Sequence, residues 1–373
     1  MQPSRLALLL FVYSILSSNL LPAQCIAPVS DLTNQQYLWD NGNRVFLEAL
    51  QPKTIVTGKN YLAWVNYNGS RSKLYYGGKT YNLCDNDAEL WRTDNWFVYK
   101  NFSNLVVLFD NKLTSIDRLA YPEYWVSDSL IVWNSTLGQV RYFYNGINEQ
   151  LEAFPLQDLT PEDGQVSNGK IGDNIFAYVD QSNNFKVLYH GQKITLETYV
   201  PQNYVVDRDM VMYIDYNGNF KFFYKGQSVE TTINNINSYW TGERFLAYYN
   251  LQGQLTVWYN GEEKTLSQDR PKSMLVRENM IAFVDQGNNF YVWYNGTLTL
   301  LDRNPVSNYK IDNDILVYQD QYGRLQGFYY GKKVEVSDQI VSSYNLYNET
   351  VTYQLVRGEI KIWCAGNTDT FIQ

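Results

Sequence analysis

Short apolar runs separated by turn residues follow one another along most of the chain. The stretch 272–301 shows the arrangement, with runs at Lys272–Arg277, Met280–Asp285, Phe290–Tyr294 and Thr297–Leu301. The last two runs are joined by Asn295-Gly296, a pair typical of a two-residue hairpin turn. After the first 23 residues, no segment shows helical periodicity over ten residues. The pattern therefore predicts an all-β chain built from units of four short antiparallel strands.

This unit recurs with a period of 35 residues. An aromatic pair, one further residue and a glycine mark most copies, and successive glycines are 35 residues apart at Gly191, Gly226, Gly261, Gly296, Gly331 and Gly366. Earlier copies are looser, and the spacing of 45 between Gly146 and Gly191 places an insertion within Leu156–Lys170. One four-stranded sheet cannot bury two aromatic faces alone, so we expect the units to stack face to face.

Repeats of this kind resemble the blades of a β-propeller, as in the TolB-like and YncE-like periplasmic propellers. The resemblance covers about residues 30–373 and concerns the architecture, because the Trp-Asp ending of WD40 blades and the Asp-box of sialidase blades are absent. It implies a single propeller domain over residues 24–373 with about eight to ten blades. We count nine complete units and a partial one at Gln36–Ala49. An open β-solenoid of the same units is the alternative.

The N-terminus has the pattern of an export signal. Arg5 precedes an apolar run, Leu6–Leu16, which is followed by a segment of mostly small and polar residues, Ser17–Ala23. This predicts a secretory signal peptide at residues 1–23, too short for a membrane span, with cleavage after Ala23. We therefore expect a periplasmic or secreted protein without a transmembrane segment. Lipid attachment at Cys25 is the minor alternative.

Charge and composition narrow the function. The chain carries 30 Lys and Arg against 38 Asp and Glu, a formal net charge of -8, which repels nucleic acid. The single histidine, His190, lies at a turn position, so we expect neither a metal site nor a cofactor. A column of aspartates at turns is interpreted as turn capping rather than cation binding: Asp180, Asp215, Asp285 and Asp320.

Three cysteines follow the predicted cleavage point: Cys25, Cys84 and Cys364. In a closed ring the two ends of the chain meet, and Cys364 replaces the tyrosine of its column. We therefore predict a Cys25–Cys364 disulfide that clasps the ring, with Cys84 as the competing partner.

Binding residues are sought where the first strand of each unit lies nearest the axis. A tyrosine recurs there, 22 residues before the glycine, and the candidates at the channel mouth are Tyr124, Trp125, Tyr204, Tyr239, Trp240, Arg244, Tyr309 and Tyr344. Packing between blades is the competing interpretation of this tyrosine column. The insertion within Leu156–Lys170 is a second candidate, because loops on a rigid scaffold often carry function.

No catalytic constellation is evident, since a Gly-rich phosphate loop, a Cys-x-x-Cys pair and a Gly-x-Ser-x-Gly elbow are all absent. We expect a non-enzymatic, protein-binding or scaffold propeller of the bacterial cell envelope, such as a soluble subunit or plug of an export or surface-assembly complex. A carbohydrate-binding, lectin-like propeller is one alternative, favoured by 33 Tyr and 10 Trp. A glycoside hydrolase-like enzyme with acids at the ring mouth is the other.

Overall fold

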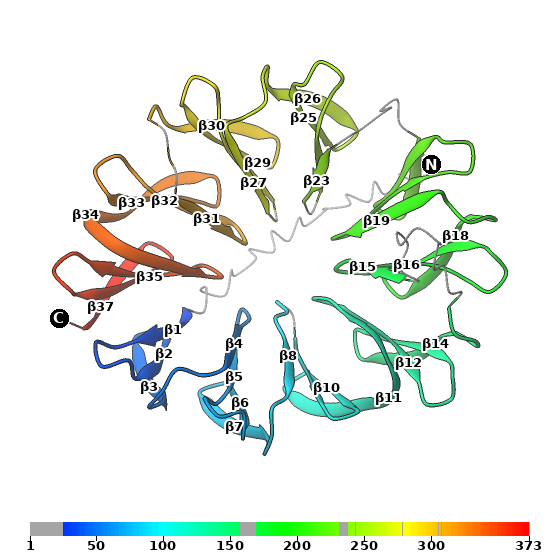
Figure 1. Ribbon diagram of the computed structural model, residues 1–373, viewed down its shortest axis with the longest axis horizontal. Coiled ribbons are helices and arrows are strands. Elements are labelled where there is room, and N and C mark those ends of the chain that lie inside the picture. Colours follow the sequence, from blue (N-terminus) through cyan, green and yellow to red (C-terminus); the bar gives the residue numbers. More distant parts are fainter. Residues whose placement is uncertain are drawn as a thin grey trace, which may run out of the picture.

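The computed structural model describes residues 25–94, 96–156, 169–230, 238–242, 244–277, 279–304, 306 and 308–372. Every regular element in these ranges is a β-strand, and Figure 1 shows the strands grouped into sheets around a central axis. A helix long and apolar enough to cross a bilayer is not found in the described ranges. The predicted signal peptide lies outside the described residues, as does most of the predicted insertion.

The first five blades run from β1 to β18. Blade 1 contains β1 (Ile26–Ser30), β2 (Gln36–Asp40) and β3 (Asn43–Glu48); blade 2 contains β4 (Thr54–Thr57), β5 (Tyr61–Val65), β6 (Ser72–Tyr76) and β7 (Lys79–Cys84); blade 3 contains β8 (Glu89–Trp91), β9 (Phe97–Asn101), β10 (Asn104–Phe109) and the start of β11 (Lys112–Val126); blade 4 contains the end of β11, β12 (Leu130–Ser135), β13 (Val140–Tyr144) and β14 (Ile147–Glu152); blade 5 contains β15 (Gly169–Ile171), β16 (Ile175–Val179), β17 (Phe185–Tyr189) and β18 (Gln192–Glu197).

The remaining blades run from β19 to β37. Blade 6 contains β19 (Asn203–Asp207), β20 (Met210–Ile214), β21 (Phe220–Tyr224) and β22 (Gln227–Glu230); blade 7 contains β23 (Tyr239–Thr241), β24 (Phe245–Tyr249), β25 (Leu255–Tyr259) and β26 (Glu262–Ser267); blade 8 contains β27 (Ser273–Arg277), β28 (Met280–Val284), β29 (Phe290–Tyr294) and β30 (Thr297–Asp302); blade 9 contains β31 (Tyr309–Asp312), β32 (Ile315–Gln319), β33 (Arg324–Tyr329) and the start of β34 (Lys332–Tyr347); blade 10 contains the end of β34, β35 (Thr350–Leu355), β36 (Ile360–Cys364) and β37 (Asn367–Ile372).

Each blade is an antiparallel meander in sequence order, and β11 and β34 each pass from one blade into the next. The predicted β-propeller, its glycine register and the four strands within 272–301 are confirmed. Within the described residues there are nine four-stranded blades and one three-stranded blade, blade 1. The predicted partial unit is therefore present, and it includes a strand that the hairpin signal did not predict, β1.

The hydrophobic core is divided among the blade interfaces. A representative cluster joins Met280 and Phe290 of blade 8 to Leu316 and Tyr318 of blade 9, all almost fully buried. The glycine column serves this packing as well as the turns. Gly296 has φ +86°, and a Cβ there would lie 3.2 Å from the ring of Tyr259 in the preceding blade. Both the backbone conformation and the nearby ring therefore disfavour a side chain at this position.

Polar bonds between blades include those of a tyrosine that lies 13 residues before the glycine in several units, such as Tyr213 before Gly226. The Tyr213 hydroxyl donates to Glu197 of the preceding blade at 3.0 Å, and Lys221 lies 2.9 Å from the same carboxylate. Lys221 also pairs with Asp215 at 3.2 Å. Asp215 accepts hydrogen bonds from the Asn217 and Asn219 backbone amides, which confirms the predicted turn cap.

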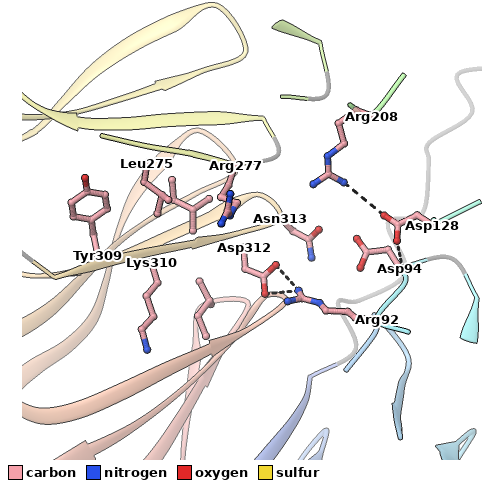
Figure 2. A pocket seen from close by; sticks show the side chains of 12 residues that line it. Arg92, Asp94, Asp128, Arg208, Leu275, Arg277, Tyr309, Lys310, Asp312 and Asn313 are labelled. Carbon is pink, nitrogen blue, oxygen red and sulfur yellow. Dashed lines mark hydrogen bonds and ion pairs between the residues drawn. The ribbon is translucent and has the colours of Figure 1, made fainter. Parts of the chain in front are cut away.

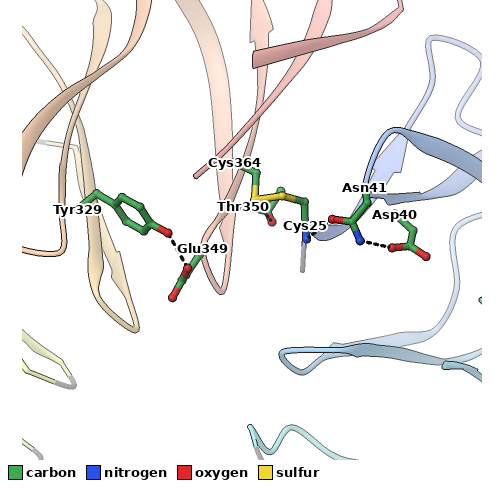
Figure 3. Close-up of a disulfide and its surroundings, with 7 residues drawn as sticks. All are labelled: Cys25, Asp40, Asn41, Tyr329, Glu349, Thr350 and Cys364. Carbon is green, nitrogen blue, oxygen red and sulfur yellow. Dashed lines mark hydrogen bonds between the residues drawn. A yellow bond between two sulfur atoms is a disulfide. The ribbon is translucent and has the colours of Figure 1, made fainter. Parts of the chain in front are cut away.

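The predicted clasp between the two ends of the ring is confirmed. A disulfide joins Cys25, just before β1, to Cys364 at the end of β36, with their Cα atoms 5.9 Å apart (Figure 3). The first and last blades share no strand, so the disulfide and the packing of Trp39 against Phe371 hold them together. The closed ring excludes the open solenoid, and the bond occupies the Cys25 sulfur that lipid attachment needs. Cys84, the competing partner, is a free thiol.

Candidate functional site

The meander decides which turns share a face of the ring. In every four-stranded blade, the turn between the first and second strands lies at the same end as the turn between the third and fourth strands. The first strand is nearest the axis, so the first-to-second turns surround one end of the central opening. We call this end the charged mouth and define it by Arg92, Asp94, Asp128, Asp173, Arg208, Arg277, Lys310 and Asp312.

A cavity of about 510 Å³ opens at the charged mouth. Residues from blades 3, 4, 6, 8, 9 and 10 line it, and most of their side chains are charged or polar. Figure 2 shows Arg277 and Lys310 on one side, Asp94 and Asp128 on the other, and Arg92 between them. Besides the ion pairs of Arg92 with Asp312 and of Arg208 with Asp128, one wall therefore presents two cations, and we call it the basic wall; the other presents two carboxylates, and we call it the acidic wall.

The basic wall holds two cations without an acidic partner among the described residues. The Arg277 guanidinium donates only to its neighbour's carbonyl, that of Val276, at 3.3 Å. Lys310 Nζ donates to the Tyr344 carbonyl oxygen at 2.7 Å and to Asn345 Oδ1 at 3.1 Å, and burial lowers its pKa. Both side chains retain the capacity to bind an added anion.

Arg92 crosses the opening from blade 3 to blade 9. Its Nη2 lies 2.6 Å from each carboxylate oxygen of Asp312 and 3.2 Å from Asn348 Oδ1. Asn348 in turn donates from Nδ2 to the Gly58 carbonyl of blade 2 at 2.7 Å. These bonds join blades on either side of blade 1, which has no innermost strand among the described residues, and so they fix the shape of the mouth.

The acidic wall is organised around Arg208 of blade 6. Its Nη1 lies 3.4 Å from Asp173 and 3.8 Å from Asp128, which belong to blades 5 and 4. Burial raises the pKa of Asp173 to about 7, opposed by the Arg208 charge and supported by the neighbouring carboxylates of Asp128 and Asp209. Burial likewise raises the pKa of Asp128, with Asp94 adding to the effect. The three carboxylates Asp94, Asp128 and Asp173 share two cations, Arg208 and Lys59, whose Nζ lies 3.9 Å from Asp94.

The candidate residues predicted from the tyrosine column lie mainly between blades. Tyr204 and Tyr344 are buried; the Tyr204 ring contacts Phe185 at 4.9 Å, and the Tyr344 hydroxyl donates to Asn308. Tyr309 lines the cavity while packing on Phe290. This placement agrees with the competing interpretation, packing between blades.

The other candidates are also dispersed around the ring. Tyr124 contacts Trp91 and donates to Glu89, Trp125 contacts Phe176, Tyr239 packs against the cluster between blades 6 and 7, Trp240 contacts Tyr249, and Arg244 is exposed in the first-to-second turn of blade 7. Tyr309 is the one candidate of the eight found among the cavity-lining residues. The candidate insertion lies largely outside the described residues.

Sequence reasoning missed the charged mouth, although a signal for it exists. In the glycine register, the position 17 residues before the glycine, or before Asn111 in its place, is polar in eight units: Asp94, Ser129, Asn174, Asp209, Arg244, Asn279, Asp314 and Glu349. In the structure several of these side chains bond to the adjacent blade, as Asn174 Nδ2 does to Asp209 at 3.1 Å and Asn279 Nδ2 to Asp314 at 3.3 Å.

The sequence matches the 10-bladed beta propeller domain over residues 20–368, and the chain belongs to this family. No curated protein matches it. Among solved structures it is similar to the computationally designed Ika8 protein, with 14% identity over 83% of this chain and 95% of that one and a TM-score of 0.35. It is also similar to BamB from Moraxella catarrhalis, with 10% identity over 83% of this chain and 96% of that one and a TM-score of 0.31. A third similar structure is PorZ, a surface component of the type-IX secretion system of Porphyromonas gingivalis, with 11% identity over 94% of this chain and 59% of that one and a TM-score of 0.26. At these identities the likeness concerns the fold alone.

Proposed function

We propose that this ten-bladed propeller is an exported, non-enzymatic protein of the bacterial cell envelope that binds another protein at its charged mouth. The observation that carries the proposal is the pair Arg277 and Lys310, which line one cavity and have no acidic partner among the described residues. A carboxylate of a partner chain supplies what they lack, because guanidinium and ammonium groups bind carboxylates through charge-assisted hydrogen bonds.

The opposite wall adds specificity. Asp94 and Asp128 line the same cavity, so a partner segment that carries an acidic group next to a basic one meets complementary charge on both sides. A polypeptide offers this combination, whereas a nucleic acid offers negative charge alone. A rigid scaffold that presents such a site suits a subunit or plug of an export or surface-assembly complex.

Export is supported by two features. The N-terminal pattern is that of a signal peptide, and a disulfide such as the one between the two ends of the ring forms and persists in an oxidising compartment. The bacterial envelope is the location we propose on these grounds.

The hydrolase alternative is favoured by one observation, the Asp173 carboxyl with a pKa of about 7 beside Asp128. The acids at the mouth nevertheless have structural partners. Asp128 accepts the Asp94 amide at 2.9 Å, and Asp312 accepts the Asn348 amide at 2.9 Å besides binding Arg92. We therefore assign these carboxylates to holding the blades together and propose no catalytic role for them.

A comparison of two double variants tests the proposal. Tagged wild-type protein is used to capture partners from envelope extract of the source organism, beside Arg277→Gln/Lys310→Gln and a matched control, Arg71→Gln/Lys264→Gln, whose side chains are exposed away from the cavity. We expect one discrete protein with the wild type and the control, and at least a tenfold loss with the mouth variant. Equal retention by both variants, or no partner at all, would refute the proposal.

A further inference from the structure

The face opposite the charged mouth carries apolar side chains at the tips of its turns. The turn between the second and third strands lies there in each four-stranded blade, and the β1–β2 turn is its equivalent in blade 1. In eight blades the tip of this turn holds a large apolar residue that is 61–81% exposed: Leu32, Tyr67, Phe102, Leu137, Tyr216, Leu251, Tyr322 and Val356. We call these the apolar tips. They form an interrupted ring, with one member in each of eight blades and glutamines, Gln181 and Gln286, at the equivalent positions of blades 5 and 8.

The apolar tips are concentrated on one face. Three further exposed apolar residues, Leu50, Phe154 and Ile340, lie in connections between blades that emerge on the same face. In the described part of the chain, the other large apolar residues that are exposed are Phe46 and Tyr81 on outer strands and Ile147 and Tyr330 near the turns of the mouth face. Single exposed apolar residues are ordinary, but a ring of them on one face indicates an interaction surface.

The turn of blade 7 forms without any contribution from its apolar side chain, Leu251. At the blade 7 turn, Asn250 Oδ1 accepts the amides of Gln252 and Gln254, and the intervening Leu251 projects outward with 76% of its surface exposed. Turn chemistry favours polar residues at such a position. An apolar residue retained there in most blades points to a contact outside the chain.

Phe102 strengthens this conclusion. It is 81% exposed and has φ +53°, in the left-handed region that bulky residues seldom occupy. Asparagine or glycine would fit the turn better and would avoid an exposed ring. The residue is thus unfavourable on two counts for the isolated protein.

We propose that the apolar tips dock this face on a lipid bilayer with neutral headgroups, an interaction separate from the proposed protein binding at the mouth. The tips are exposed on eight separate blades, so a rigid protein would need a separate pocket for each of them. A bilayer is flat and deformable, and Tyr, Phe and Leu partition into its interfacial region.

The turn backbones and the charge of the chain fit this assignment. The blade 7 turn satisfies its own backbone, with the Asn250 amide bonded to the Gln254 carbonyl and the Gly253 amide to the Asn250 carbonyl. Insertion of such a tip leaves few amides without partners. The net charge of -8 disfavours anionic lipids and explains why neutral headgroups are specified.

Flotation with phosphatidylcholine vesicles tests the proposal, using protein secreted by the expression host. We expect the wild type to float with these vesicles, and less so when a third of the lipid is phosphatidylglycerol. Leu137→Ser/Leu251→Ser removes two tips and should weaken binding about a hundredfold, at about tenfold per side chain. The matched control Tyr81→Ser/Ile147→Ser should bind like the wild type.

A second variant separates docking from folding. Phe102→Asn should raise or preserve the melting temperature, because asparagine tolerates the left-handed conformation, and yet weaken vesicle binding about tenfold. Absence of wild-type flotation would overturn the proposal, as would equal binding by the tip and control variants. A dimer in sedimentation that only the tip variants lose would assign the face to a second copy and would also overturn it. Arg277→Gln/Lys310→Gln should leave flotation unchanged, so the two proposals fail independently.

Discussion

Loss of the Cys25–Cys364 disulfide should loosen the ring at a defined place. The bond spans a sequence separation of 339 residues, and blades 1 and 10 share no strand that would otherwise lock them. Chain entropy for a loop of this length gives about 6 kcal/mol of stabilisation relative to the reduced unfolded chain. With an unfolding entropy of about 2.1 cal/mol/K per residue, this corresponds to a fall of about 8 °C in Tm.

The assay compares Cys25→Ser/Cys364→Ser with wild-type protein by calorimetry and by amide hydrogen exchange. Cys84→Ser is the matched control, because this free thiol is only partly buried at the edge of a core cluster and lies 3.5 Å from the Asn86 carbonyl. We expect the double variant to melt about 8 °C lower and the control within about 2 °C of the wild type.

Hydrogen exchange locates the effect. Exchange should accelerate first in β1, β36 and β37, where the packing of Trp39 on Phe371 remains the main link between the ends, and last in blades 5 and 6. A double variant that melts within 2 °C of the wild type, or that gains exchange evenly around the ring, would refute the clasp as the main closure.

Three further predictions concern contacts between blades. Asp173→Asn should raise the free energy of unfolding at pH 8 by at most about 4 kcal/mol and leave it unchanged near pH 4. The pKa of about 7 in the folded state exceeds that of an unfolded aspartate, so the wild type loses stability as the pH rises from about 4 to 7. Urea titrations at both pH values check this. Gly296→Ala should destabilise the protein by at least about 1 kcal/mol more than Gly261→Ala, because both glycines have φ near +90° but only Gly296 faces a tyrosine ring. Equal losses of stability in urea denaturation would contradict the role of Gly296 in packing. Lys221→Met should cost about 1–2 kcal/mol at pH 7, through its bonds to Glu197 and Asp215, while the exposed Lys225→Met should cost less than about 0.5 kcal/mol in the same assay.

The repeat made the architecture predictable, because one period governs both the turns and the packing. The spacing of 35 between glycines such as Gly261 and Gly296 places equivalent strands in register, and the meeting of the ends in a closed ring brings Cys25 to Cys364. The same regularity made the proposed binding surfaces hard to recognise in the sequence. A tyrosine that recurs in most units, such as Tyr204, recurs because it packs between blades, and Tyr204 is buried for that reason.

The two surfaces could be recognised only after the turns were assigned to faces. Leu32, Tyr67, Phe102 and Leu137 are each 35 residues apart, so the ring of apolar tips is visible in the sequence. Whether such a column is buried or exposed depends on the strand order, which the alternation of apolar runs does not specify. The cavity at the mouth requires side chains from blades far apart in the sequence, as in the contact between Arg92 and Asp312, and no local pattern contains that information.

The most direct test of the central claim, that the charged mouth binds another protein, is site-specific photo-crosslinking in the source organism. A benzophenone amino acid is placed at Arg244, exposed at the mouth, and in a control at Lys264 on the outer strand β26. We predict one discrete protein adduct from position 244 that Arg277→Gln/Lys310→Gln abolishes, and none from position 264. No adduct from position 244, or the same adducts from both positions, would contradict the claim.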